Sequence, residues 1–216
     1  MNIFFLYKCF KKAAQAQCDR HVVKMILEMA QLLSTAIRVY QEGLPEDERA
    51  DAELEWLELY KKTHQHGQMR KWINESNANF EWVLGHGLAL CEEYTYRYGK
   101  THKTQALLER IRDSWEEVIE FERDDLTVPP AYTAEGHRPR EELRQSRDHE
   151  RIMEYKVQPR HASWDDLTND YRRFYRDVKS KMEWFKYAKN RPKPEFLEEE
   201  DAPKSPKRAR VDVQVE

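Results

Sequence analysis

A stripe of chemically versatile side chains runs along the first long stretch with helical periodicity. The stripe comprises His21, Lys24, Glu28, Gln31, Thr35 and Arg38. Steps of three and four residues place such side chains on one helix face. Glu28 could act as a general base or electrostatic stabiliser, Lys24 as a Schiff-base amine and His21 as a proton shuttle. The alternative is a solvated face on which Lys24 and Glu28 form an ordinary i,i+4 ion pair.

A second polar stripe recurs at roughly helical steps farther along the chain. It comprises Asn79, Trp82, His86, Glu93, Arg97 and Lys100. Polar atoms beside a tryptophan are typical of a solvated cleft, so we expect His21, Lys24 and Glu28 to line a concavity that faces this stripe. For His86, which lies between two glycines, the alternative is a histidine packed in the core.

Two segments combine cations with aromatic rings. In residues 94–103 the DNA-contacting candidates are Arg97, Tyr98, Lys100, His102 and Lys103, and in the last helical stretch they are Arg172, Arg173, Arg176, Trp184 and Lys186. Cations bind phosphates and rings stack on bases, so both segments favour nucleic-acid contact. The alternatives are cations that complement a helix C-terminus and a run of charge that is only solvated.

Metal and nucleotide motifs are weak or missing. His64 and His66 could supply two metal ligands, but no convincing third ligand accompanies them, and we predict no metal site. The sequence has no Walker loop, GxSxG or GxGxxG, so it gives no basis for nucleotide hydrolysis or serine hydrolase chemistry, and we predict no cofactor.

Hydrophobic periodicity predicts the elements that would position these residues. Helices are expected over about 12–41, 51–62, 77–98, 104–121 and 163–189, after a short buried strand or extended segment at residues 3–7. Gly99 is placed to end the third of these helices in a left-handed cap, and Ser163 to begin the last one. Residues 124–161, with several prolines, are expected to form a long surface excursion.

Composition favours an all-α fold. The 216 residues include only six glycines but six tryptophans, eleven tyrosines and eight phenylalanines, enough large apolar groups for one core although 36% of residues are charged. We therefore predict a compact helical domain over residues 1–190, with a short N-terminal extended segment, followed by a disordered tail over 191–216.

Location and surface charge are also constrained. Three widely spaced cysteines favour a reducing compartment, and no signal peptide or membrane span is recognisable. A net charge of −3 argues against a wholly basic nucleic-acid coat but allows a local basic face. The sequence leaves the oligomeric state open.

The predicted tail carries a basic cluster after an acidic run. Its cations are Lys204, Lys207, Arg208 and Arg210, and Ser205 precedes a proline as a phosphorylation site would. This pattern is typical of a nuclear localisation signal, which implies a nuclear import receptor as partner and the host nucleus as location. The alternative is a basic tail that only solubilises the chain or touches nucleic acid.

Three motifs carry a resemblance to known proteins. The segments 18–33 (CDRHVVKMILEMAQLL), 74–82 (NESNANFEW) and 92–103 (EEYTYRYGKTHK) resemble a family of uncharacterised proteins from phages and large DNA viruses, over roughly residues 1–190. More distantly, the layout is similar to that of pyrimidine-dimer DNA glycosylases of the phage endonuclease V type. That resemblance implies a compact helical enzyme in which Asp19, His21 and Glu28 occupy site positions, with Glu28 as the catalytic carboxylate.

The resemblance leaves the nucleophile open. The glycosylases attack with the α-amino group of a small second residue, but Asn2 stands there in this chain, and Leu27 replaces the arginine that precedes their catalytic glutamate. The amine of Met1, Lys24 or no nucleophile at all are the alternatives. We expect a viral DNA-directed enzyme of the base-excision or base-modification kind that acts on an extruded nucleotide. The alternative is a non-enzymatic nuclear protein that binds DNA or a host factor.

Overall fold

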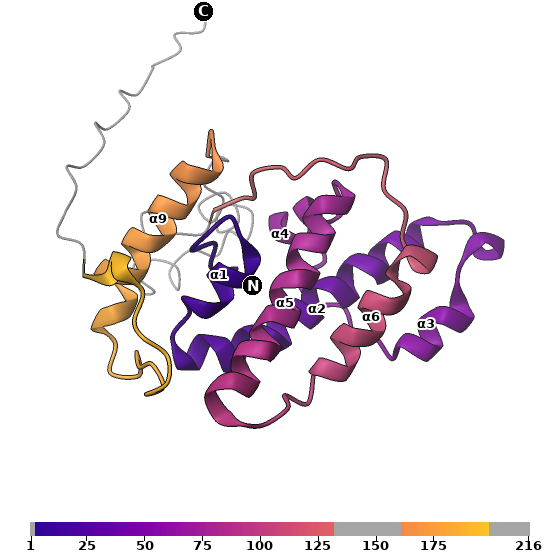
Figure 1. Ribbon diagram of the computed structural model, residues 1–216. Coiled ribbons are helices and arrows are strands. Elements are labelled where there is room, and N and C mark those ends of the chain that lie inside the picture. Colours follow the sequence, from indigo (N-terminus) through magenta and orange to yellow (C-terminus); the bar gives the residue numbers. More distant parts are fainter. Residues whose placement is uncertain (1–2, 132–160, 199–216) are drawn as a thin grey trace, which may run out of the picture.

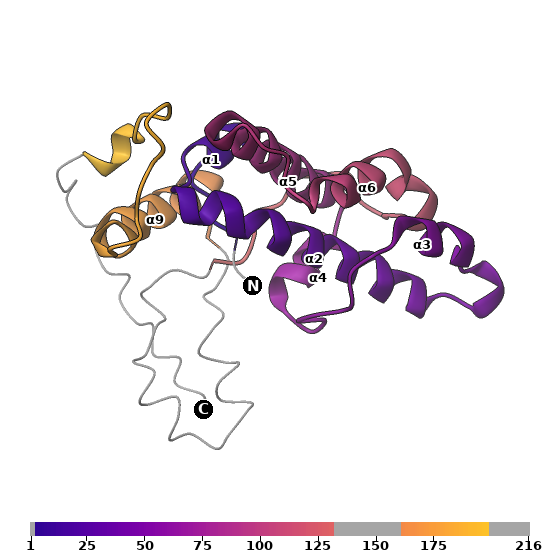
Figure 2. The same cartoon turned by 90° about the horizontal axis from the view of Figure 1, so that it is seen from below.

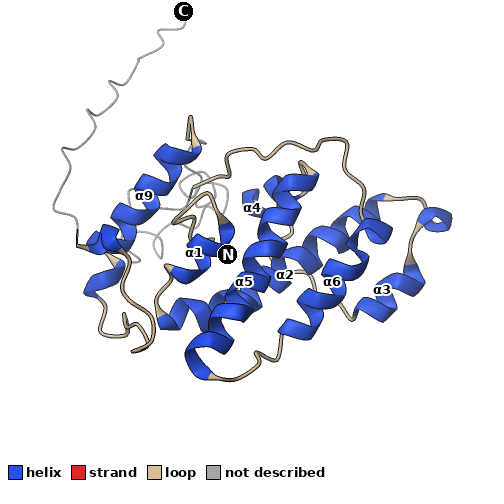
Figure 3. Cartoon of the chain, in the orientation of Figure 1, coloured by secondary structure: helices blue, strands red, loops and turns tan. Residues whose placement is uncertain are grey.

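The computed structural model describes residues 3–131 and 161–198, and these fold as helices joined by irregular segments without a strand (Figures 1 and 3). The α-helices are α1 (Phe10–Gln15), α2 (Asp19–Gly43), α3 (Asp51–Leu57), α4 (Gln68–Ile73), α5 (Asn77–Tyr98), α6 (Gln105–Val118) and α9 (Trp164–Asp177). Short 3-10 turns lie at Glu46–Glu48, Lys179–Lys181 and Glu195–Leu197. The predicted all-α class is therefore confirmed, and none of the described helices is long and apolar enough to cross a membrane.

The centre of the fold is the antiparallel pair of α2 and α5, which pack along much of their length (Figure 1). Met25, Ile26, Met29 and Leu33 of the apolar arc predicted on α2 are buried. Gly87 permits close packing of α5, because a Cβ there would lie 3.2 Å from side-chain atoms of both Met29 on α2 and Leu108 on α6.

Both ends of α5 follow the sequence signals. Ser76 accepts a hydrogen bond on its side chain from the Asn79 amide and so caps the helix, and Gly99 ends it at φ 63°. Ser163 likewise caps α9 by accepting from the Asp166 amide. At these ends the capping chemistry is local, and this is why the sequence predicts them.

The expected helix over residues 12–41 is two helices, which corrects the sequence interpretation. α1 ends at Gln15, and α2 begins at Asp19 after an extended Cys18. The break coincides with two distant tyrosines: the Tyr175 hydroxyl accepts from the Cys18 amide (3.1 Å), and the Tyr187 hydroxyl donates to the Ala16 carbonyl (2.8 Å). Tertiary partners therefore satisfy backbone groups that a continuous helix would use.

Three other expected helix ends also move. α3 stops at Leu57, because Glu58 takes a left-handed φ of 52°, and α6 stops at Val118, before an extended Ile119. α9 stops at Asp177, not near residue 189, since the aromatic residues that follow turn back over the fold. Phe185 packs edge-on against Tyr175, with ring centroids 5.3 Å apart.

α9 lies beside α1 at one end of the molecule (Figures 1 and 2). The extended segment 3–6 is buried among aromatic residues, and Phe5 contacts Trp72, Trp82 and Trp164. Residues 191–198, which the sequence interpretation assigned to the tail, also contact the domain: Phe196 is buried and faces Tyr7, with ring centroids 6.2 Å apart.

Candidate functional site

The polar stripe on α2 divides into two halves. In the C-terminal half Thr35 and Arg38 hold the connection between α3 and α4: the Thr35 hydroxyl accepts from the Thr63 amide, and Arg38 donates to the carbonyls of Leu59 and Tyr60 (2.8 and 3.0 Å). These two side chains satisfy the backbone of an irregular segment. They therefore serve the fold, and the N-terminal half of the stripe contains the remaining candidates.

Lys24 and Glu28 form an ion pair between an exposed lysine and a largely covered glutamate of α2. The Lys24 ammonium lies 2.9 Å from Glu28 Oε1, and the lysine side chain is 65% exposed. Asn79 is fully buried, and its side chain is bonded to Trp72 and Thr127, so no open concavity can face it. The expectation that the three residues line a concavity facing Asn79 is therefore corrected.

His21 is buried in an aromatic setting. Its ring stacks on Phe4 with centroids 4.1 Å apart, and its Nδ1 atom lies 2.5 Å from the Tyr175 hydroxyl. Burial, with Lys179, Lys24 and Arg20 close by, lowers the pKa of His21 to about 3. His21 is consequently a neutral imidazole at physiological pH, unsuited to moving protons there.

Asp19 belongs to a network of four charged residues. The buried Arg97 donates to Asp19 Oδ1 (2.8 Å) and Glu93 Oε1 (2.6 Å), and Arg191 donates to both Glu93 oxygens (2.7 and 2.6 Å). Arg97 also donates to the Gln15 carbonyl. Two guanidinium groups are thus matched by two carboxylates, and the pKa of Arg97 is raised although burial opposes this.

This network corrects the prediction that Arg97 contacts DNA. The Arg97 side chain is fully covered, and Asp19 has a second role in accepting from the Ala188 amide (3.0 Å). The network fixes the segment after α9 to the start of α2 and the end of α5. The network therefore has a structural role, because it holds these three parts of the fold together.

Asn79, Trp82 and His86 of the α5 stripe are also structural, which corrects the expected solvated cleft. Asn79 is buried and holds Thr127 and the Trp72 carbonyl, and Trp82 donates to the Lys8 carbonyl. The Nδ1 atom of His86 donates to the Phe10 carbonyl (3.0 Å), and burial lowers the pKa of His86 to about 4. The core alternative for His86 therefore fits.

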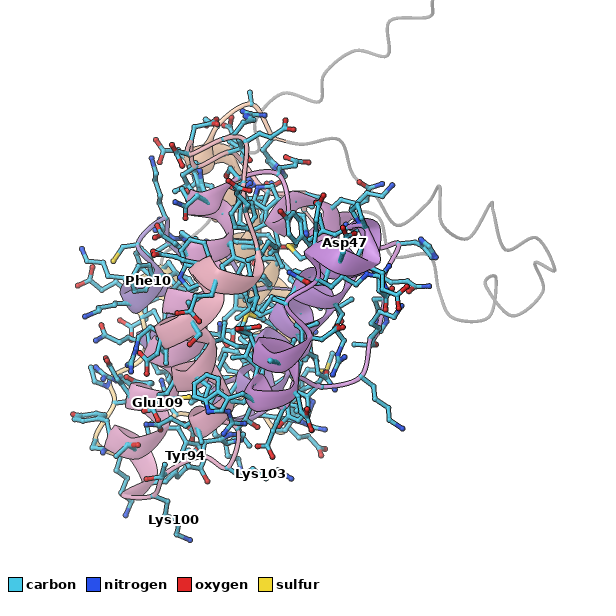
Figure 4. All side chains as sticks on the ribbon, turned by 90° about the vertical axis from the view of Figure 1, so that its right-hand side faces the viewer. Phe10, Asp47, Tyr94, Lys100, Lys103 and Glu109 are labelled. Atoms are coloured by element: carbon cyan, nitrogen blue, oxygen red, sulfur yellow. The ribbon has the colours of Figure 1, made fainter. Side chains whose placement is uncertain are left out.

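The end of α5 and the turn after it present exposed cations. Figure 4 shows Lys100 and Lys103 projecting at the lower end of the molecule, with Tyr94 just above them. Both lysines are exposed, and Tyr94 packs against Tyr98 and His102, with ring centroids 4.9 and 5.1 Å apart. Desolvation and Lys103 lower the pKa of His102. The predicted DNA-contacting residues here, apart from Arg97, lie at the surface.

The arginines predicted on the last helix have partners within the fold. Arg172 donates to the Leu6 carbonyl (2.8 Å) and lies 4.2 Å from the Tyr7 ring centroid. Arg173 lies 3.5 Å from Asp170, and Arg176 donates to Asp177 (3.0 Å). The three cations are thus already engaged within the fold, and their contact with DNA stays a prediction.

Trp184 is a second gathering point for cations. The Arg20 guanidinium carbon lies 4.9 Å from its ring centroid and the Lys179 ammonium 6.0 Å, and His21 packs against the same indole. Lys179 also lies 5.0 Å from the Phe174 ring centroid. Arg20 was missed by sequence reasoning, because its proximity to a tryptophan 164 residues later has no local signal.

We call this surface the basic end. It consists of Arg20, Lys100, Lys103, Lys179, Lys181, Trp184 and Lys186. Tyr96 and Asn190 join its two halves, since the Tyr96 hydroxyl donates to the Asn190 carbonyl and the Asn190 amide to the Tyr96 carbonyl, each at 2.7 Å. Within residues 3–131 and 161–198, no ion pair engages any of these six cations.

A groove of about 760 Å³ lies elsewhere, between α1, α5 and α6. Phe10, Leu88 and Cys91 contribute apolar surface, and Glu92 and Glu109 contribute carboxylates. Desolvation and these two acids raise the pKa of Cys91 to about 12, so its thiol is not activated as a nucleophile.

The remaining expectations concern a metal site and residues near both ends of the chain. Across these residues no group of three or more His, Cys, Asp or Glu side chains could hold a metal ion. Met1 and Asn2 lie outside the described residues, as do Lys204, Lys207, Arg208 and Arg210 of the predicted nuclear signal.

Comparison with known proteins yields no match to a family model, to a curated protein or to a solved structure. The residues and their geometry therefore carry the functional argument.

Proposed function

We propose that this protein binds DNA through the basic end. The observation that carries the proposal is that the six cations of the basic end form no ion pair among the described residues, with Arg20 and Lys179 against Trp184 and Lys100 and Lys103 just after the tyrosines of α5. Such cations can neutralise phosphates, and adjacent rings can stack on bases.

The charge distribution supports this surface over the rest of the molecule. The chain carries a net charge of −3, yet residues 178–190 contain four lysines and only one acid, Glu183. The nearby acids Asp19 and Glu28 are already paired with Arg97 and Lys24. A phosphate backbone at this end would therefore meet unmatched positive charge.

The geometry favours binding over base excision as the function. Glu28 is paired with Lys24, and His21 is neutral and enclosed by aromatic rings. A flipped nucleotide needs a pocket lined by the reacting groups, and these residues do not line the groove between α1, α5 and α6. If the basic run 204–210 acts as an import signal, the DNA would be nuclear.

Fluorescence anisotropy with a labelled 20-base-pair duplex, measured across a salt series, tests the proposal. Lys100→Gln/Lys103→Gln should weaken binding about tenfold at low salt and reduce the slope of log affinity against log salt by about 1 to 2, because phosphate contacts release counterions. The matched control is Lys61→Gln/Lys71→Gln, which removes the same charge from exposed lysines near α4.

Equal weakening by both variants would mean that binding follows net charge alone, and the proposed surface would be wrong. The same protein is also incubated with a duplex containing an abasic site under borohydride. Strand cleavage or a trapped adduct that is lost in Glu28→Gln would contradict a purely binding role and restore the enzymatic alternative.

A further inference from the structure

His21 leaves one polar atom unused next to the cations of the basic end. Its Nε2 atom makes no hydrogen bond with another described residue, and it is not among the fully enclosed polar atoms of this part of the chain that lack a partner. The side chain as a whole is only 5% exposed. Nε2 is therefore a solvent-reachable point on an otherwise buried ring.

The contacts of Tyr175 assign a proton to this atom. The Tyr175 hydroxyl accepts from the Cys18 amide, and its own proton can go to His21 Nδ1 at 2.5 Å or to the Cys18 sulfur at 3.6 Å. Sulfur is a weak acceptor, so the proton goes to Nδ1. A neutral imidazole that accepts at Nδ1 carries its hydrogen on Nε2 and donates there.

Cations surround the same ring. Arg20 and Lys179 share the Trp184 indole with His21, and Lys179 also lies 5.8 Å from the centroid of Phe4, on which His21 stacks. Desolvation and repulsion from Lys24 lower the pKa of Lys179. A bound anion would relieve this repulsion.

Two of these cations have no carboxylate partner. Lys24 is paired with Glu28, whereas neither Arg20 nor Lys179 forms an ion pair with a described residue. A phosphomonoester carries nearly two negative charges at neutral pH, while an internal phosphodiester carries one. Two free cations and a neutral N–H donor thus match the monoester better.

We infer that Arg20, Lys179 and the Nε2 hydrogen of His21 form a binding site for the terminal phosphate of a nucleic acid. The inference rests on the proposed function and refines it, because it names a phosphorylated strand end as the preferred ligand. Trp184 would lie beside the last base, where its ring can contribute stacking.

NMR titration of the full chain tests the site, with the Trp184 indole and His21 ring signals as the readout. Inorganic phosphate should shift both signals in a saturable way. Lys179→Met should weaken that binding about tenfold, because it removes a charge-assisted contact, and Lys179→Arg should largely restore it. Lys61→Met is the matched control, since Lys61 is an exposed lysine outside the basic end, and it should change the affinity less than about twofold.

A second pair of titrations identifies the source of the phosphate. A short single strand with a 5′-phosphate should bind more tightly than the same strand with a 5′-hydroxyl, and Lys179→Met should remove the difference. No saturable shift with phosphate, or equal losses for Lys179→Met and Lys61→Met, would overturn the site.

The two proposals fail in different ways. Duplex binding that persists while phosphate causes no shift would refute the terminal-phosphate site and leave the DNA-binding function standing. Saturable phosphate binding without binding to any DNA would refute the DNA-binding function, and with it the nucleic-acid ligand, and would leave only a site for small phosphates.

Discussion

The buried charge network and the basic end lie side by side and are built from similar residues. Both contain arginine or lysine next to aromatic rings, and Arg97 and Lys100 are only three residues apart. In the network, however, Arg97 and Arg191 are matched by Asp19 and Glu93, whereas the cations of the basic end have no acid partner among the described residues. The difference teaches that carboxylate pairing, and not the run of charge, separates a structural cation from one available to a ligand.

Removing the central acid should break the first region most severely. Glu93→Gln leaves Arg97 buried with one carboxylate fewer, and we expect a loss of about 3 to 5 kcal/mol in the free energy of unfolding. Urea denaturation followed by circular dichroism measures it. Lys24→Gln is the control, because the Lys24 side chain is 65% exposed, and it should cost less than about 1 kcal/mol. Comparable losses in the two variants would show that the network contributes no more to stability than the Lys24–Glu28 pair does.

Acid should weaken the enclosed region next. The folded pKa values of His21 and His86 are about 3 and about 4, below the ordinary 6.5, so the unfolded chain binds more protons below pH 6.5. The stability contributed by the neutral histidines is full above pH 6.5 and falls as the pH drops toward 4. Two such groups give a loss of about 2 to 3 kcal/mol at pH 5.5.

Urea denaturation at pH 7.5 and 5.5 measures this loss. His86→Asn keeps an amide donor near the position of Nδ1 but cannot titrate, so the pH-dependent part of the loss should fall by about half. An unchanged pH dependence in His86→Asn would mean that His86 does not contribute to it.

Arg191 tests whether the network fastens the segment that crosses the basic end. Arg191→Gln removes two hydrogen bonds to Glu93 but leaves Arg97 in place, so we expect a loss of about 1 to 2 kcal/mol. Hydrogen exchange should quicken at the Ala188 amide, which Asp19 accepts. Unchanged hydrogen exchange at this amide would mean that Arg191 does not anchor the segment.

The smallest effect on stability is expected at the basic end. Lys100→Gln/Lys103→Gln should change the free energy of unfolding by less than about 0.5 kcal/mol, because both side chains are exposed and form no ion pair with a described residue. Denaturation of the variant used in the DNA titration checks this. A large loss of stability would mean that these lysines are structural, as Arg97 is, and the difference between the two regions would disappear.

Local signals were sufficient to predict part of the fold. The sequence predicts α5 over residues 77–98, because Ser76 and Gly99 supply both of its ends within a few residues. It also predicts the buried arc of α2 and the all-α class. These features depend on periodicity and capping, which are legible without knowledge of the tertiary structure.

Features that depend on distant partners could not be predicted. The break before α2 depends on Tyr175 and Tyr187, more than 150 residues away. Arg97 follows tyrosines and precedes lysines in the sequence, which gives no sign that it is buried. Its burial depends on Asp19, which pairs with it, and on Arg191, which shares Glu93 with it. For the candidate site, the sequence indicated Trp184 and Lys186 but could not show that Arg20 joins them.

The contact of Tyr175 with Cys18 and His21 also orders the events of folding. During synthesis the first helices leave the ribosome long before residues 171–196, which cover Phe4 and His21. Until those residues emerge, the start of α2 lacks its aromatic cover. A chain that terminates before residue 171 would expose this apolar surface. The N-terminal part of the fold therefore needs the C-terminal residues to cover it.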